Sequence, residues 1–208
     1  MLGASYATLP LLGNLATHPE WGVRSFVAVS GFPLMMDFLE PMGDLFARYA
    51  REHGHGRTAA DLARMARATP EALDLTAFKR RFLEHFHERL PNVTITLDRF
   101  EVLEFRRADL IGEIQSFGHS PLSPDVDLTT AVPSLWIYGR DDNILALHND
   151  ASRRDFRRRV RLVAPDAELC EADIDHWTHG PGHTHALARA VTFILEHSRP
   201  GTPEPALP

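Results

Sequence analysis

Three short segments of this chain carry side chains that could perform covalent chemistry together. Ser5 lies in the small-residue segment Gly3–Ala7, Asp142 follows an apolar run that ends at a glycine, and His176 lies in a polar stretch near the C-terminus. A serine hydroxyl becomes a nucleophile when an imidazole takes its proton, and a carboxylate can orient that imidazole. If the fold brings the three side chains together, the chemistry they predict is attack on an electrophilic carbon.

Each of these residues also has a competing interpretation. Ser5 could simply cap the helix that follows it. Asp142 could close a turn through its own carboxylate, and Asp141 is the neighbouring alternative as the acid. Three further histidines rival His176 as the base because they lie in the same stretch: His179, His183 and His185.

The segments that precede these residues indicate a parallel sheet. Arg24–Ser30 and Val132–Tyr138 are apolar runs with little polar alternation, which is typical of strands covered on both faces. Glu168–Ala172 is a shorter third strand. Amphipathic helices are predicted beside these strands over Tyr6–Ala16, Asn149–Arg161 and His183–His197. Reactive groups in such sheets gather at the carboxyl ends of the strands, where Asp142 and His176 both stand.

The middle of the chain has a helical pattern of apolar residues. We predict helices there over Asp37–His53, Thr58–Ala68, Leu75–Leu90 and Asp98–Phe117. The expected organisation is an α/β core formed by residues 1–33 and 129–198, an inserted all-helical cap over 34–128, and a disordered tail over 199–208, which contains four prolines. Phe32 and Met35 come where the strand Arg24–Ser30 meets this cap, so we expect them to line a substrate pocket.

The composition narrows the class of protein. The net charge is −6, and no basic surface calls for nucleic acid. No apolar stretch approaches the roughly 20 residues of a membrane span, and the first residues do not resemble a secretory signal. A single cysteine, Cys170, excludes an internal disulfide and favours a cytoplasmic location. The six arginines between Arg153 and Arg161 are better explained as an exposed helix face than as an anion site.

Several of these landmarks resemble the α/β-hydrolase family. Gly3-Ala4-Ser5-Tyr6-Ala7 is similar to the family's G-x-S-x-G nucleophile turn, with Ala7 in place of the second glycine. The strand ending VAVSG and the segment VPSLWIYGRDD resemble later family strands, and the order serine, aspartate, histidine matches. The resemblance covers nearly all of residues 1–198 and implies a partial α/β-hydrolase fold, a parallel sheet with flanking helices and an inserted helical cap.

This resemblance implies a serine hydrolase that cleaves a carboxylic ester or a related acyl bond of a small-molecule substrate. Ser5 would be the nucleophile, Asp142 the acid and His176 the base, with the backbone N–H of Tyr6 in the oxyanion hole. No cofactor is required. A metal site at the histidine-rich stretch is disfavoured, because its spacing matches no metal-binding pattern.

Family members usually have several strands before the nucleophile turn, whereas only Met1 and Leu2 precede Gly3 here. The second oxyanion donor normally comes from a loop in that earlier part. Three explanations stay open: a start codon assigned too far downstream, a natural gene fragment, or a chain completed by a partner or by itself as a homo-oligomer. The alternative function is a non-catalytic α/β-hydrolase-like protein that binds a ligand or partner through its cap.

Overall fold

The computed structural model describes residues 1–68, 92–96, 102–106, 129–140 and 142–198. Its main sheet has four parallel strands in the order β1 (Leu2–Ala4), β2 (Phe26–Val29), β5 (Ser134–Gly139) and β6 (Glu168–Ala172). Every residue of β5 is buried, which confirms the sequence-based expectation of a strand covered on both faces. The fold class is therefore α/β, as predicted.

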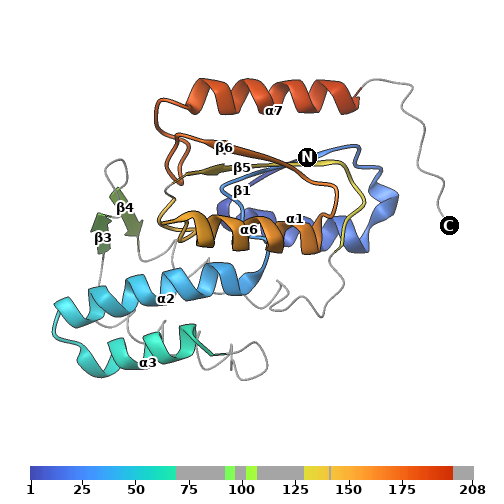
Figure 1. The fold of residues 1–208 in the computed structure, drawn as a ribbon. Coiled ribbons are helices and arrows are strands. Elements are labelled where there is room, and N and C mark those ends of the chain that lie inside the picture. The colour runs from blue at the N-terminus through green and yellow to red at the C-terminus, as the bar shows by residue number, and fades with distance from the viewer. Residues whose placement is uncertain (69–91, 97–101, 107–128, 141, 199–208) are drawn as a thin grey trace.

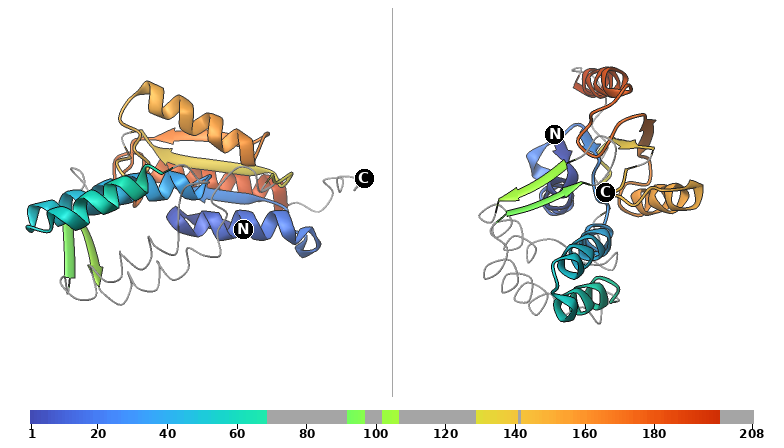
Figure 2. Two further views of the ribbon diagram at one scale, coloured as in Figure 1. Left: turned by 90° about the horizontal axis from the view of Figure 1, so that it is seen from below. Right: turned by 90° about the vertical axis from the view of Figure 1, so that its left-hand side faces the viewer.

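Helices cover both faces of this sheet (Figures 1 and 2). After β1 the chain makes a 3₁₀ turn at Ser5–Ala7, continues as α1 (Thr8–Thr17) and makes a second 3₁₀ turn at Pro19–Trp21. α1 and α6 (Asp150–Val163) lie on one face, and α7 (His183–Ser198) lies on the other. The predicted helices beside the strands are thereby confirmed.

Two hydrophobic cores result from the alternation of side chains along the strands. On one face, Ala28 and Trp136 pack in the core that holds α1 and α6. On the other face, Val27 and Ile137 pack in the core that holds α7, whose Phe193 is only 1% exposed. Because successive residues of β2 and β5 serve opposite faces, a shift of one residue in register would exchange the two cores.

A pair of packed helices follows β2. They are α2 (Met35–Glu52) and α3 (Gly56–Ala66), which lie side by side below α6 in the view of Figure 1. Both confirm predicted helices. Leu45 and Phe46 of α2 belong to the same core as Ile144 and Leu145, which follow β5. This packing holds α2 against the loop that comes after β5.

The prediction of an all-helical middle segment is wrong. β4 (Val102–Arg106) lies inside the predicted helix over Asp98–Phe117 and pairs antiparallel with β3 (Asn92–Thr96), which lies just before it. Apolar and polar residues alternate along β3 and from Leu103 onward in β4, and the register pairs Ile95 with Leu103 and Val93 with Phe105. Short runs of this kind fit a helical and a strand period equally well, and β-branched residues favour the strand. The helix predicted over Leu75–Leu90 and the tail over 199–208 lie outside the described residues.

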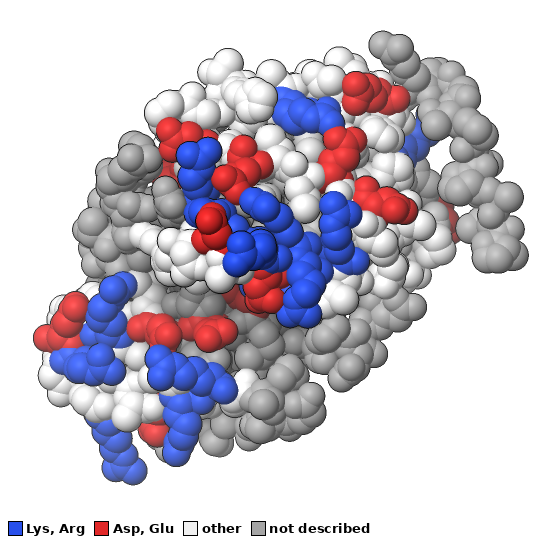
Figure 3. Space-filling view, in the orientation of Figure 1, with Lys and Arg blue, Asp and Glu red and all other residues white. Residues whose placement is uncertain are grey.

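The arginine-rich face of α6 is exposed and mixed in charge (Figure 3). Arg157 forms an ion pair of 2.7 Å with Glu171, Arg158 one of 2.8 Å with Asp155, and Arg153 one with Asp150. Most of the cluster therefore forms a solvated helix face with acidic partners, as the sequence favours, whereas the side chains of Arg153 and Arg159 are largely buried. Within the described ranges, no helix is both long and apolar enough to pass through a bilayer.

Two glycines give a matched test of this packing. A Cβ at Gly139 would lie 2.2 Å from the carbonyl oxygen of Ile174, so backbone must move to admit it. We predict that Gly139→Ala lowers the free energy of unfolding by about 1–3 kcal/mol. Gly13, in α1, has no atom within 4 Å of such a Cβ, and Gly13→Ala should raise it by up to about 1 kcal/mol. Urea unfolding of both variants measures the difference, and equal effects would contradict the close approach.

Candidate active site

The ring of His176 lies between the side chains of Ser5 and Asp142. Its Nε2 is 2.8 Å from Ser5 Oγ, and its Nδ1 is 2.9 Å from one Asp142 carboxylate oxygen and 3.1 Å from the other. A carboxylate can only accept hydrogen bonds, so the proton of the neutral ring belongs on Nδ1 and leaves Nε2 to accept from the hydroxyl. The structure thus brings together the three residues that the sequence singles out.

These three side chains come from the carboxyl ends of three different strands. Ser5 follows β1, Asp142 follows β5, and His176 follows β6. The side chains of Asp142 and His176 are fully buried, whereas Ser5 is half-buried. A half-buried hydroxyl backed by a buried imidazole and carboxylate can meet a reactant from solvent while the supporting groups stay shielded from water.

The backbone at Ser5 is strained, with φ at 50°, in the left-handed region that non-glycine residues seldom adopt. Gly3 allows the turn to fold back tightly, because a Cβ there would lie 2.8 Å from the side chain of Leu11. The helix-cap interpretation of Ser5 is wrong. The N-cap of α1 is Ala7, and the Ser5 hydroxyl is bonded to His176.

Ala7, two residues after Ser5, is exposed, so its methyl group lies outside the packed interior. The close contact falls instead between α1 and the end of β2. A Cβ at Gly31 would lie 2.3 Å from Thr8 Oγ1. Sequence reasoning missed Gly31, although its position directly after an apolar strand was a signal that the backbone comes close to another element there.

Asp142 uses its carboxylate in two ways at once. One oxygen accepts hydrogen bonds from the backbone N–H groups of Ile144 and Leu145, each at 2.9 Å, and the same carboxylate binds the ring of His176. The sequence left a turn-closing role and an acid role as alternatives, and the structure contains both contacts. Asp141, the other candidate, lies outside the described residues.

Two aromatic side chains lie close to the ring of His176. Phe32 lies 5.9 Å away between ring centroids, and Trp177 lies 5.2 Å away at 89°. Phe32 is fully buried, so it packs against the imidazole, whereas Trp177 is 44% exposed. Tyr6 follows Ser5 in the 3₁₀ turn. Met35 is the first residue of α2, but its side chain is outside the described part of the structure.

The other three histidines of this stretch, His179, His183 and His185, lie at the surface of the protein. His183 Nδ1 is 2.8 Å from the carbonyl oxygen of Thr178, and His179 lies beside Asp175. His185 is exposed on α7. Within the part of the chain that the structure describes, no three potential ligands cluster as a metal site would require.

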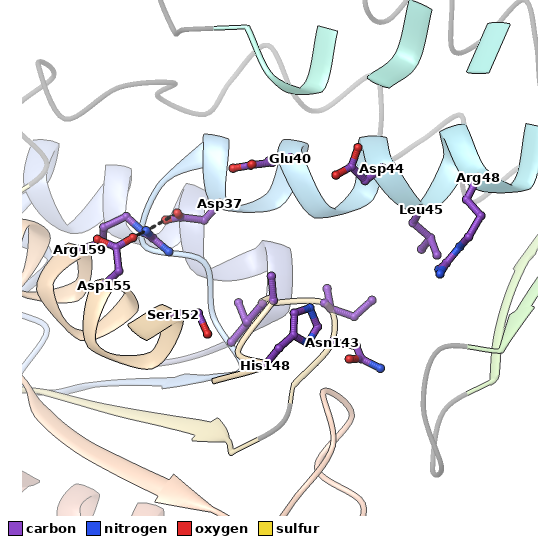
Figure 4. Close-up of a pocket in the computed structure, with 13 residues that line it drawn as sticks. Asp37, Glu40, Asp44, Leu45, Arg48, Asn143, His148, Ser152, Asp155 and Arg159 are labelled. Carbon is purple, nitrogen blue, oxygen red and sulfur yellow. Dashed lines mark hydrogen bonds and ion pairs between the residues drawn. The ribbon is translucent and has the colours of Figure 1, made fainter. Parts of the chain in front are cut away.

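A separate cavity of about 450 Å³ lies between α2, α6 and the loop after Asp142 (Figure 4). Ser5 and His176 do not line it. Its charged lining includes an ion pair of 2.6 Å between Asp37 and Arg159, and burial raises the pKa of Asp37 to about 6 against the attraction of Arg159. The cavity shares Ile144 and Leu145 with the turn that binds Asp142.

Comparisons with known proteins complete this description. No family model matches the chain, and no curated protein matches it in sequence. Among solved structures, the chain is similar to the mouse α/β hydrolase domain-containing protein 10 (14% identity, TM-score 0.47, 94% of this chain and 60% of that one) and to an esterase of Pyrococcus furiosus (18%, 0.45, 95% and 53%). A Rhodococcus esterase is similar at 17% and 0.44, with 95% and 65% covered. The chain spans less than two thirds of the length of each.

The double use of Asp142 gives a stability prediction. Asp142→Ala removes the acceptor of two buried N–H groups and should lower the free energy of unfolding by about 3 kcal/mol. Asp142→Asn keeps a carbonyl oxygen for both bonds, so its loss should be clearly smaller. Denaturant unfolding of the two variants provides the measurement, and equal losses would mean that the turn does not depend on these bonds.

Proposed function

We propose that this chain carries the active site of a serine hydrolase that cleaves a carboxylic ester or a related acyl bond. The observation that supports this proposal is the His176 ring, which is within hydrogen-bond distance of Ser5 on one side and Asp142 on the other. The strained turn at Ser5 adds support, because unusual backbone angles concentrate at functional sites.

In the proposed reaction, Ser5 Oγ attacks the carbonyl carbon while Nε2 of His176 takes the hydroxyl proton. The carbonyl π bond opens to an oxyanion, and Asp142 stabilises the imidazolium. When the tetrahedral intermediate collapses, the bond to the leaving alkoxide breaks, and His176 returns the proton to that oxygen as the alcohol departs. Water then attacks the acyl-Ser5 ester with the same proton transfers, releasing the carboxylic acid and free serine.

The oxyanion needs hydrogen-bond donors. We assign the backbone N–H of Tyr6 to this role, because the residue after the nucleophile donates in this type of turn. Each oxyanion donor contributes about 3 kcal/mol of transition-state stabilisation. The turnover rate therefore depends strongly on which further donors the assembled protein presents, whereas formation of the first covalent bond with a reactive probe depends mainly on Ser5 and His176.

We further propose that residues 1–33 and 129–198 form the catalytic core and that residues 34–128 form a cap that shapes the substrate site. The Phe32 ring lies 5.9 Å from the His176 ring between centroids, and α2 begins three residues later at Met35. The chain between β2 and the proposed cap therefore lies close to the reactive groups. We assign Phe32 and Met35 to the wall of the substrate pocket.

A second candidate function is ligand binding without catalysis, and the charged cavity favours it. Glu40, Asp44 and Arg48 of α2 line this space together with His148 (Figure 4), and its volume is in the range that holds small molecules. A ligand with both positive and negative groups would suit this lining.

Labelling with a fluorophosphonate probe distinguishes the two functions. We predict that the probe attaches to Ser5, that Ser5→Ala abolishes labelling, and that His176→Ala slows it by at least about 100-fold through loss of the general base. Ser198→Ala is the matched control, because Ser198 is exposed at the end of α7, and it should label like the wild type. Intact-protein and peptide mass spectrometry measure the result.

Wild-type protein that stays unlabelled, or that labels equally after Ser5→Ala, would contradict the hydrolase. Thermal stabilisation of such protein by a small zwitterion, unchanged by Ser5→Ala, would then support ligand binding.

A further inference from the structure

The turn that carries His176 is built on the carboxylate of the preceding residue. Asp175 Oδ1 accepts hydrogen bonds from the backbone N–H groups of Trp177, at 2.9 Å, and His179, at 2.7 Å. The backbone N–H of Asp175 donates in turn to the carbonyl oxygen of His179 at 2.7 Å. One buried side chain therefore ties both ends of the turn together around His176.

The side chain of Asp175 is more deeply buried than the closing of a surface turn requires. Its side chain is fully buried, and Oδ2 has no hydrogen bond within the described residues, although Nδ1 of the exposed His179 lies 3.3 Å away. Burial of a carboxylate carries a desolvation cost, so such groups persist where a specific geometry depends on them.

Other contacts fix the remainder of this loop against the sheet. Gly182 N–H donates to the carbonyl oxygen of Asp173 at 2.9 Å, and a Cβ at Gly180 would lie 2.5 Å from that same oxygen. Thr178 adopts a left-handed φ of 68°. Because these contacts fix residues 178–182 against Asp173, few backbone conformations remain open to His176 as long as the Asp175 carboxylate closes the turn.

We propose that Asp175 is a positioning residue for the hydrolase, holding the His176 ring in line between Ser5 and Asp142 through the turn 175–179. This inference rests on the proposed function. In this role Asp175 acts through the turn that carries His176, not on the reacting groups themselves. The ring has hydrogen bonds of 2.8 Å and 2.9 Å on opposite edges, and a displacement of about 1 Å can cost a rate about 100-fold.

The test compares Asp175→Ala with Asp175→Asn in the full chain, using Asp166→Asn as the control. Asp166 is an exposed acidic residue in the turn before β6. Two readouts are needed: the rate constant of fluorophosphonate labelling, separated from the probe's half-saturation concentration, and the low-field proton resonance of the His176 Nδ1–H bonded to Asp142. Circular dichroism establishes that each variant is folded at the assay temperature.

We expect Asp175→Ala to lower the labelling rate constant by about 100-fold, with little change in half-saturation, and to remove the low-field resonance. Asp175→Asn should retain both, because its carbonyl oxygen can accept the two turn hydrogen bonds. Asp166→Asn should match the wild type. If Asp175→Ala unfolds, Asp175→Ser takes its place, since its hydroxyl accepts one of the two bonds and predicts an intermediate loss.

An Asp175→Ala variant that keeps the wild-type labelling rate and resonance would overturn the proposal, as would an Asp175→Asn variant as impaired as the alanine one. A different result tests the proposed function. Wild-type protein that shows the resonance but no labelling would contradict the hydrolase, and the resonance in the variants would still decide whether Asp175 positions His176.

Discussion

The two hydrogen bonds of the His176 ring are the interactions on which the candidate site depends. They join residues that are 171 and 34 positions apart in the chain, so they exist only if three strands end at the same edge of one sheet. A parallel sheet provides this arrangement, because all of its carboxyl ends lie on one side. The site is therefore a product of the sheet's topology rather than of any local motif.

The sheet in turn depends on close packing at a few small residues. Gly3, Gly31 and Gly139 each lie where a Cβ would come within 2.8 Å of a neighbouring atom. Gly3 and Gly31 bring α1 against β1 and the end of β2, and Gly139 brings the end of β5 against the segment before His176. These contacts determine how near Ser5, Asp142 and His176 come to one another, since distances of this kind are set by backbone placement before side chains adjust.

The parts that sequence reasoning predicts well are those governed by a single strong period. β2 and β5 are continuous apolar runs, and α6 and α7 have helical spacing, so their type follows from hydrophobic pattern. The candidate residues could be found because residues that follow the strands of a parallel sheet gather at its carboxyl edge, and because the order serine, aspartate, histidine resembles that of a known family. The strands β3 and β4 were not predicted, because the apolar pattern of a five-residue run fits a helical period and a strand period equally well. Asp175 was passed over, since its hydrogen bonds depend on a turn conformation that composition does not specify.

A double-mutant cycle between His176 and Asp142, measured as the rate at which Ser5 reacts with an activated phosphonate, tests the central claim most directly. Groups that work as one unit give strongly non-additive losses. The account predicts that His176→Ala combined with Asp142→Asn reacts no more slowly than His176→Ala alone. Losses that multiply in the double variant would show that the two residues act independently and would contradict the account.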